Sequence, residues 1–131
     1  MGTKKIIKYT CEDNYLDEPV YSRIKELFEG NNISWQFFGG TSDLNDDPKQ
    51  FYFGHNIYQD HTSVSPIGTE LVPLIDKINP MALHRVRVNL MPRTEDNTES
   101  DFHCDYDEGF AYPDRIDLWN TSIYYLNDCD G

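Results

Sequence analysis

The chain has 131 residues, the length of one domain, and its leucine, isoleucine, valine and phenylalanine residues make up about a quarter of it, which is enough for a folded core. With 11 Lys and Arg residues against 23 Asp and Glu residues, its formal net charge is -12. This charge repels the phosphate backbone of nucleic acids and anionic membrane surfaces, so we expect neither as a partner.

Export and membrane insertion are not expected either. No apolar run approaches the roughly 20 residues that span a bilayer, and residues 1–8 lack the apolar centre of about 7–15 residues found in signal peptides. Cys11, Cys104 and Cys129 are an odd number of cysteines without Cys-X-X-Cys spacing, which suits a reducing compartment. The sequence therefore predicts a cytoplasmic protein with a single domain over residues 1–131.

The first half of the chain carries the signals of two helices. Residues 6–11 are typical of a short opening strand. Asp17 is a suitable N-cap for a helix that stops at Gly30, with an apolar side formed by Val20, Ile24, Leu27 and Phe28. A second helix is predicted from Ser65-Pro66 to Asn79-Pro80, with an apolar side formed by Ile67, Leu71, Leu74, Ile75 and Ile78.

Strand-like segments lie between these helices and fill most of the chain after them. They are residues 33–38, 51–57, 83–91, 101–106 and 118–126. Helices early and strands late are typical of an α+β fold with a mainly antiparallel sheet.

The last strand candidate, residues 121–127, is apolar on both faces, which is the pattern of a strand inside a sheet. The Asp130-Gly131 dipeptide that follows commonly turns a chain into another antiparallel strand. We therefore expect this chain to be the N-terminal part of a longer protein. The alternative is a genuine C-terminus that ends in turn residues.

Residues 101–108 are the segment best suited to chemistry. In an extended conformation it places Asp101, His103, Asp105 and Asp107 on one face. An imidazole and a carboxylate two residues apart offer two neighbouring ligands to a divalent ion, as in the facial-triad iron site. Because the chain is rich in aspartate, this spacing also arises by chance, and an acidic solvated strand face is the alternative.

Five segments extend this pattern over most of the chain: EDNYLDEPVYSRI, FYFGHNIYQD, LVPLIDKINPMALHRVRVNLMPRTED, DFHCDYD and TSIYYLND. They contain an arginine-rich strand, a His-X-Asp pair and a Tyr-Leu-Asn strand, in that order. With them the chain resembles the Fe(II)/2-oxoglutarate-dependent oxygenases, in particular the small prolyl-4-hydroxylase-like proteins of marine phages and bacteria.

The resemblance implies the first part of a double-stranded β-helix (a jelly-roll or cupin-like fold), with the N-terminal helices packed on it and the final barrel strands missing. It implies that His103 and Asp105 are two ligands of Fe(II). In such proteins the third ligand, a histidine, and the basic residue that pairs with 2-oxoglutarate lie downstream, here beyond Gly131. The implied reaction couples decarboxylation of the co-substrate 2-oxoglutarate, with O2, to hydroxylation of a substrate, for which prolyl or other peptidyl groups are the nearest analogy.

Three residues are candidates for contacting 2-oxoglutarate. Related proteins commonly carry a tyrosine near the end of the arginine-rich strand, where this chain has Met91, so Asn89 is the alternative on the same face. Thr121 and Tyr125 share a face of the last strand and would line the pocket by resemblance, although such residues in a buried strand often only pack.

Two other functions fit the same residues. A non-catalytic partial jelly roll would bind another chain through an exposed edge at residues 121–127. A simple divalent-metal binder would use the acidic face near residues 101–108, where oxygen donors suit Mg²⁺ or Ca²⁺ and the imidazole favours a transition metal.

Overall fold

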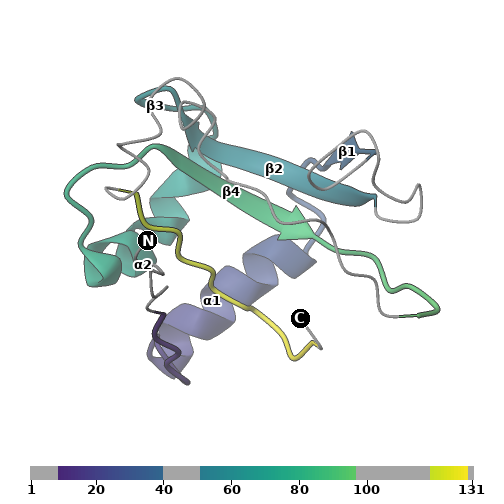
Figure 1. Cartoon of the computed structure of the whole chain (residues 1–131), viewed down its shortest axis with the longest axis horizontal. Helices are drawn as coiled ribbons and strands as arrows, with labels where there is room; N and C mark the ends of the chain where they lie inside the picture. Colours follow the sequence, from purple (N-terminus) through teal and green to yellow (C-terminus); the bar gives the residue numbers. More distant parts are fainter. Residues whose placement is uncertain (1–8, 40–50, 97–118, 130–131) are drawn as a thin grey trace, which may run out of the picture.

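The computed structural model describes residues 9–39, 51–96 and 119–129, which form an α+β fold with an antiparallel sheet of four strands. The elements are α1 (Glu18–Glu29), β1 (Gln36–Phe38), β2 (Tyr52–Gln59), β3 (Thr62–Ser63), the 3-10 helix η1 (Pro66–Leu71), α2 (Val72–Ile78) and β4 (Arg85–Leu90). Among these elements, α1 and α2 lie on the same side of the sheet (Figure 1). The predicted α+β class with antiparallel pairing is confirmed.

Helix α1 begins and ends where the sequence predicts. Asp17 precedes it in an extended conformation, and the Asp17 carbonyl accepts hydrogen bonds from the backbone N–H groups of Val20 and Tyr21, at 3.0 and 2.9 Å. The Asp17 side chain makes no capping bond, so only its backbone fills the predicted role. The apolar side of α1 is buried at Ile24, 1% exposed, and at Phe28.

The second predicted helix is divided between η1 and α2. Ser65 precedes η1 without capping it, because its hydroxyl is bonded to His55 instead. A Cβ on Gly68 would come within 2.9 Å of Ile57 Cγ2, so the glycine lets η1 lie directly on β2. The predicted end of this helix is confirmed, since Asn79 adopts a left-handed conformation with a φ of 52° and its N–H donates to the Ile75 carbonyl.

Strand β2 is the centre of the sheet. It pairs with β1 over Tyr52–Gly54 and with β3 over Tyr58–Gln59, while β4 pairs with it over Phe53–Gln59. The β4 register shifts between Asn56 and Tyr58, so Ile57 is an extra residue on β2. Its side chain is 2% exposed and enters the core.

The core lies between the sheet and the helices. It comprises Leu16, Ile24, Phe28, Ile57 and Leu71. Val86 and Val88 of β4 pack against it, which places the alternate residue Arg87 on the opposite face, as the alternation along this strand predicts.

The sequence predicts a strand at 118–126, and this prediction is wrong for residues 119–126, which the structure describes. The described part is irregular, and it runs from His84, where the Trp119 and His84 rings are 4.8 Å apart, to α1 (Figure 1). Tyr124 and Leu126 pack against the core, and the Tyr21 hydroxyl donates a 2.7 Å hydrogen bond to the Leu126 carbonyl. A side chain of α1 therefore holds this backbone instead of a strand neighbour.

The other strand predictions are met in part. The predicted strand at 33–38 is shorter, at Gln36–Phe38, and residues 9–11, the described part of the predicted opening strand, have no regular structure. The predicted strand at 101–106 lies outside the described residues. In the parts of the chain that the structure describes, no helix has the length and apolar character needed to cross a membrane.

Candidate functional site

The predicted metal ligands His103 and Asp105 lie outside the described residues. Within residues 9–39, 51–96 and 119–129, no three His, Cys, Asp or Glu side chains are grouped so that they could hold a metal ion. Of the cysteines, Cys11 and Cys129 are exposed free thiols.

Asn89 lies near the end of β4, opposite Gly54 of β2. It is exposed and shares a sheet face with Arg87, since the two residues are two positions apart on one strand. Its amide is thus presented on the face opposite the core.

Thr121 and Tyr125 lie in the irregular segment and are both exposed, with Tyr125 at 58%. Because the neighbouring Tyr124 and Leu126 turn toward the core, the two predicted residues share the outward side of the segment. Within the described ranges, no hydrogen bond or ring contact joins either of them to Asn89. The strand edge on which a partner-binding function would depend is absent from residues 119–129.

A cluster of polar and aromatic side chains occupies the sheet face opposite the core. Arg87 Nε donates to Asn56 Oδ1 at 2.9 Å, and Nη1 donates to the Tyr52 hydroxyl at 3.2 Å. The guanidinium carbon lies 5.1 Å from the centroid of the Phe38 ring, which stacks on Tyr52 with centroids 4.9 Å apart. Three strands therefore fix the guanidinium between hydrogen bonds and a ring face.

Gly54 makes this cluster possible. A Cβ at this position would approach Phe38 Cε2 to 2.8 Å, so any larger residue would push the Phe38 ring from its place. Neither Asn56 nor Tyr52 is among the site residues predicted from the sequence. Asn56 and Tyr52 meet Arg87 because of the register in which β2 pairs with β4, and the sequence of one strand alone does not specify that register.

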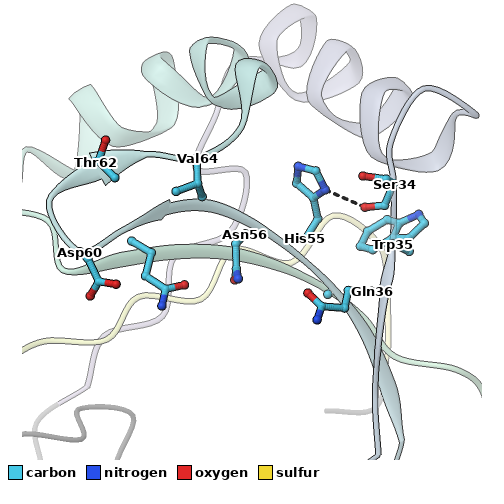
Figure 2. Close-up of a pocket in the computed structure, with 10 residues that line it drawn as sticks. Ser34, Trp35, Gln36, His55, Asn56, Asp60, Thr62 and Val64 are labelled. Carbon is cyan, nitrogen blue, oxygen red and sulfur yellow. Dashed lines mark hydrogen bonds between the residues drawn. The ribbon is translucent and has the colours of Figure 1, made fainter.

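A hollow of about 420 Å³ lies beside the cluster, at the edge of the sheet between β1 and β3. In Figure 2, Trp35 and Gln36 stand at one end, Asp60 and Thr62 at the other, and Asn56 between them. Asn56 therefore belongs to both the cluster and the hollow. Sequence reasoning did not identify this hollow, because its residues come from two separate segments of the chain.

His55 borders the hollow with both ring nitrogens engaged. Nδ1 is 2.7 Å from the Ser34 carbonyl, which only accepts, so Nδ1 carries the proton and donates to it. In the neutral imidazole, Nε2 then accepts the hydrogen bond from the Ser65 hydroxyl, 2.7 Å away. The connectivity is that of a serine nucleophile with its base, but Ser65 is 6% exposed and does not line the hollow. We assign the bonds a structural role, tying β2 to the segments before β1 and η1.

Two side chains have shifted pKa values at the place where residues 119–129 pack against α1. A hydrogen bond with Tyr21, and then the charge of Glu29, whose carboxylate is 3.8 Å away, raise the pKa of Lys25. Burial raises the pKa of the Tyr124 hydroxyl, with smaller effects of Tyr21 and Glu18. Both groups belong to the contact between α1 and residues 119–129.

Comparisons of the chain with protein-family models, with curated proteins and with solved structures found no match.

Proposed function

We propose that this protein is an Fe(II)- and 2-oxoglutarate-dependent oxygenase of the cytoplasm, built on a double-stranded β-helix. The observation that carries the proposal is the order of three sequence elements: the arginine-rich strand β4, the His103-X-Asp105 pair and the Tyr125-Leu-Asn127 segment. An imidazole and a carboxylate are the donor types of the facial-triad iron site, so the chemistry of the pair fits Fe(II).

The arrangement of the described sheet supports this proposal. Both α-helices of the described ranges cover one face, and the other face carries the polar side chains of Arg87, Asn56 and Asn89 (Figure 1). In the proposed fold, the face opposite the helices would line the barrel interior, where a polar co-substrate requires hydrogen-bond partners. A polar face of this kind fits that use better than an apolar one would.

In the proposed site, His103 and Asp105 would hold the metal together with a third ligand. Fe(II) held there would supply, with 2-oxoglutarate and O2, the oxidising chemistry that hydroxylates a substrate C–H bond while 2-oxoglutarate is converted to succinate and CO2. The amide of Asn89 would donate a hydrogen bond to a 2-oxoglutarate oxygen on this face. The hydroxyls of Thr121 and Tyr125 lie on a segment that packs against the core and α1, so they are proposed as co-substrate contacts by the resemblance alone. The substrate class closest by analogy is a prolyl or other peptidyl group.

The test uses the protein produced from its own complete reading frame. Succinate release and anaerobic Fe(II) or Mn(II) binding are measured for His103→Ala, Asp105→Ala and the parent. Both substitutions should abolish metal-dependent succinate release and weaken metal binding, because each removes a ligand.

Matched controls are His61→Ala and Asp13→Ala, which remove the same side-chain types from exposed positions. Both should keep parental succinate release. Undiminished release in His103→Ala and Asp105→Ala would overturn the proposal.

A further inference from the structure

We propose that the hollow between β1 and β3 binds a neutral, hydroxyl-rich ligand of the size of a mono- or disaccharide. The hollow lies on the β1 and β3 side of the central strand β2, whereas β4 pairs with the other side. The proposal is independent of the iron site proposed above.

The hollow follows from a gap along one edge of β2. Strand β1 pairs with β2 as far as Gly54, and β3 begins its pairing at Tyr58. Between these two paired stretches, His55 and Asn56 of β2 pair with neither β1 nor β3, and the hollow lies beside them. Its volume of about 420 Å³ lies within the usual range of small-molecule sites.

The lining of the hollow is rich in groups that both donate and accept hydrogen bonds. Three carboxamides line it, Gln36, Asn56 and Gln59, together with the hydroxyl of Thr62 and the carboxylate of Asp60. An amide offers N–H donors beside a carbonyl acceptor, and a sugar hydroxyl likewise donates and accepts, so the two match in pairs. The residues that line this hollow include no Lys or Arg, and the chain carries a net charge of -12, which disfavours phosphate or carboxylate ligands.

Asn56 is oriented for such a ligand before it binds. Its Oδ1 accepts the Nε–H of Arg87 at 2.9 Å, so the amide cannot flip without placing two donors against each other. Its N–H groups are therefore directed away from Arg87. A donor that is already fixed loses less conformational entropy when a ligand binds.

Trp35 adds an aromatic surface at one end of the hollow (Figure 2). The C–H face of a sugar ring is apolar and packs on an indole ring, while its hydroxyl groups reach the amides. His55 contributes only its ring, since Ser34 and Ser65 occupy both nitrogens. The site is thus suited to binding, and the His55 imidazole does not act in it as a base.

A cationic ligand is the main competitor, because Asp60 and Trp35 are groups that attract an ammonium ion. Such a ligand has donors only, and would leave the N–H groups of the three amides without partners. The lining therefore favours a hydroxyl-rich ligand over a cation.

The two tryptophans of the chain give a direct test. Trp119→Phe leaves Trp35 as the single indole, and its fluorescence is titrated with methyl glucoside, methyl galactoside, maltose and cellobiose. At least one sugar should shift the emission saturably, with a Kd on the order of 1 mM. Gln59→Ala should weaken that sugar about three- to tenfold, the loss of roughly one hydrogen bond. Asn31→Ala, an exposed amide outside the hollow, should leave the Kd unchanged.

The same titration on Trp35→Phe, where only Trp119 reports, should show no shift. The unsubstituted protein gives a second readout by NMR, in which the Trp35 indole N–H and the three side-chain amides should move with the sugar. The proposal would be overturned if none of the four sugars gave a saturable response up to about 50 mM. The Kd would then exceed about 50 mM, which corresponds to a binding free energy of less than about 2 kcal/mol. A response to lysine methyl ester or inorganic phosphate in place of the sugars would also overturn it.

Discussion

Arg87 Nε lies 2.9 Å from Asn56 Oδ1, and these two residues are direct partners across the β2–β4 ladder. Through this bond, the guanidinium of Arg87 on the face opposite the core fixes the amide of Asn56, which also lines the hollow between β1 and β3. The same guanidinium bonds the Tyr52 hydroxyl, so its removal would release two polar groups at once.

Arg87→Met tests the structural part of this relationship. Methionine keeps the apolar stem beside Phe38 but leaves Asn56 and Tyr52 without their donor, so the free energy of unfolding should fall by about 1–2 kcal/mol. Urea denaturation measures the change. Arg93→Met removes an exposed arginine and should have an effect within about 0.5 kcal/mol of zero. An equal effect of the two substitutions would contradict the assigned role of Arg87.

Ile24 provides a test of the core. It is 1% exposed, so Ile24→Ala should lower the free energy of unfolding by about 2–5 kcal/mol through lost burial and the cavity left behind. Ile123→Ala makes the same chemical change at a side chain that is 70% exposed, and should alter it by less than about 0.5 kcal/mol. Similar values for the two variants would show that α1 does not pack on the sheet as described.

Local signals predicted the helices well. The spacing of Ile24 and Phe28, with Asp17 before and Gly30 after them, places α1 within one residue of its bounds, because a helix is specified by neighbours along the chain. Asn79 marks the end of α2 in the same way, since a left-handed residue there is a local requirement.

Contacts between distant residues account for what the sequence did not predict. Residues 119–126 have the apolar pattern of a strand, yet the Tyr21 hydroxyl holds their backbone from 105 residues away. Ser65 has the pattern of a helix cap, yet its hydroxyl bonds His55. The roles of His103, Asp105, Asn89, Thr121 and Tyr125 stay predictions, and the hollow depends on a register that one strand alone does not specify.

The contact between α1 and residues 119–129 depends on Tyr21. Tyr21→Phe removes the 2.7 Å hydrogen bond to the Leu126 carbonyl, at a cost of about 0.5–1.5 kcal/mol. Amide hydrogen exchange should become faster in residues 124–128 and stay unchanged in β2. Tyr125→Phe, at a position 58% exposed, is the control and should leave exchange unchanged. Unaltered exchange in Tyr21→Phe would show that packing alone holds the segment.

The proposed co-substrate contacts lead to a kinetic prediction for the protein from its own reading frame. Asn89→Ala, Thr121→Ala and Tyr125→Phe should each raise KM for 2-oxoglutarate about three- to tenfold, because each removes roughly one hydrogen bond to the bound molecule. Binding of Mn(II) should not change, since none of the three is a proposed ligand. If all three variants keep the parental KM, these residues do not contact 2-oxoglutarate. This measurement does not test the metal ligands.

Tyr124 makes stability depend on alkaline pH. Burial raises the pKa of its hydroxyl above the ordinary value of 10.0, so the folded protein keeps the proton to a higher pH than the unfolded chain does. The stabilising contribution is complete below about pH 10 and is lost as the pH rises through the folded pKa. Urea denaturation between about pH 8 and about pH 11 should therefore show a steeper loss of stability in the parent than in Tyr124→Phe. The pKa of Lys25 is also raised, but both proteins contain Lys25, so its contribution cancels in the difference. Parallel curves for the two proteins would show that the Tyr124 hydroxyl is as well solvated in the folded state as in the unfolded chain.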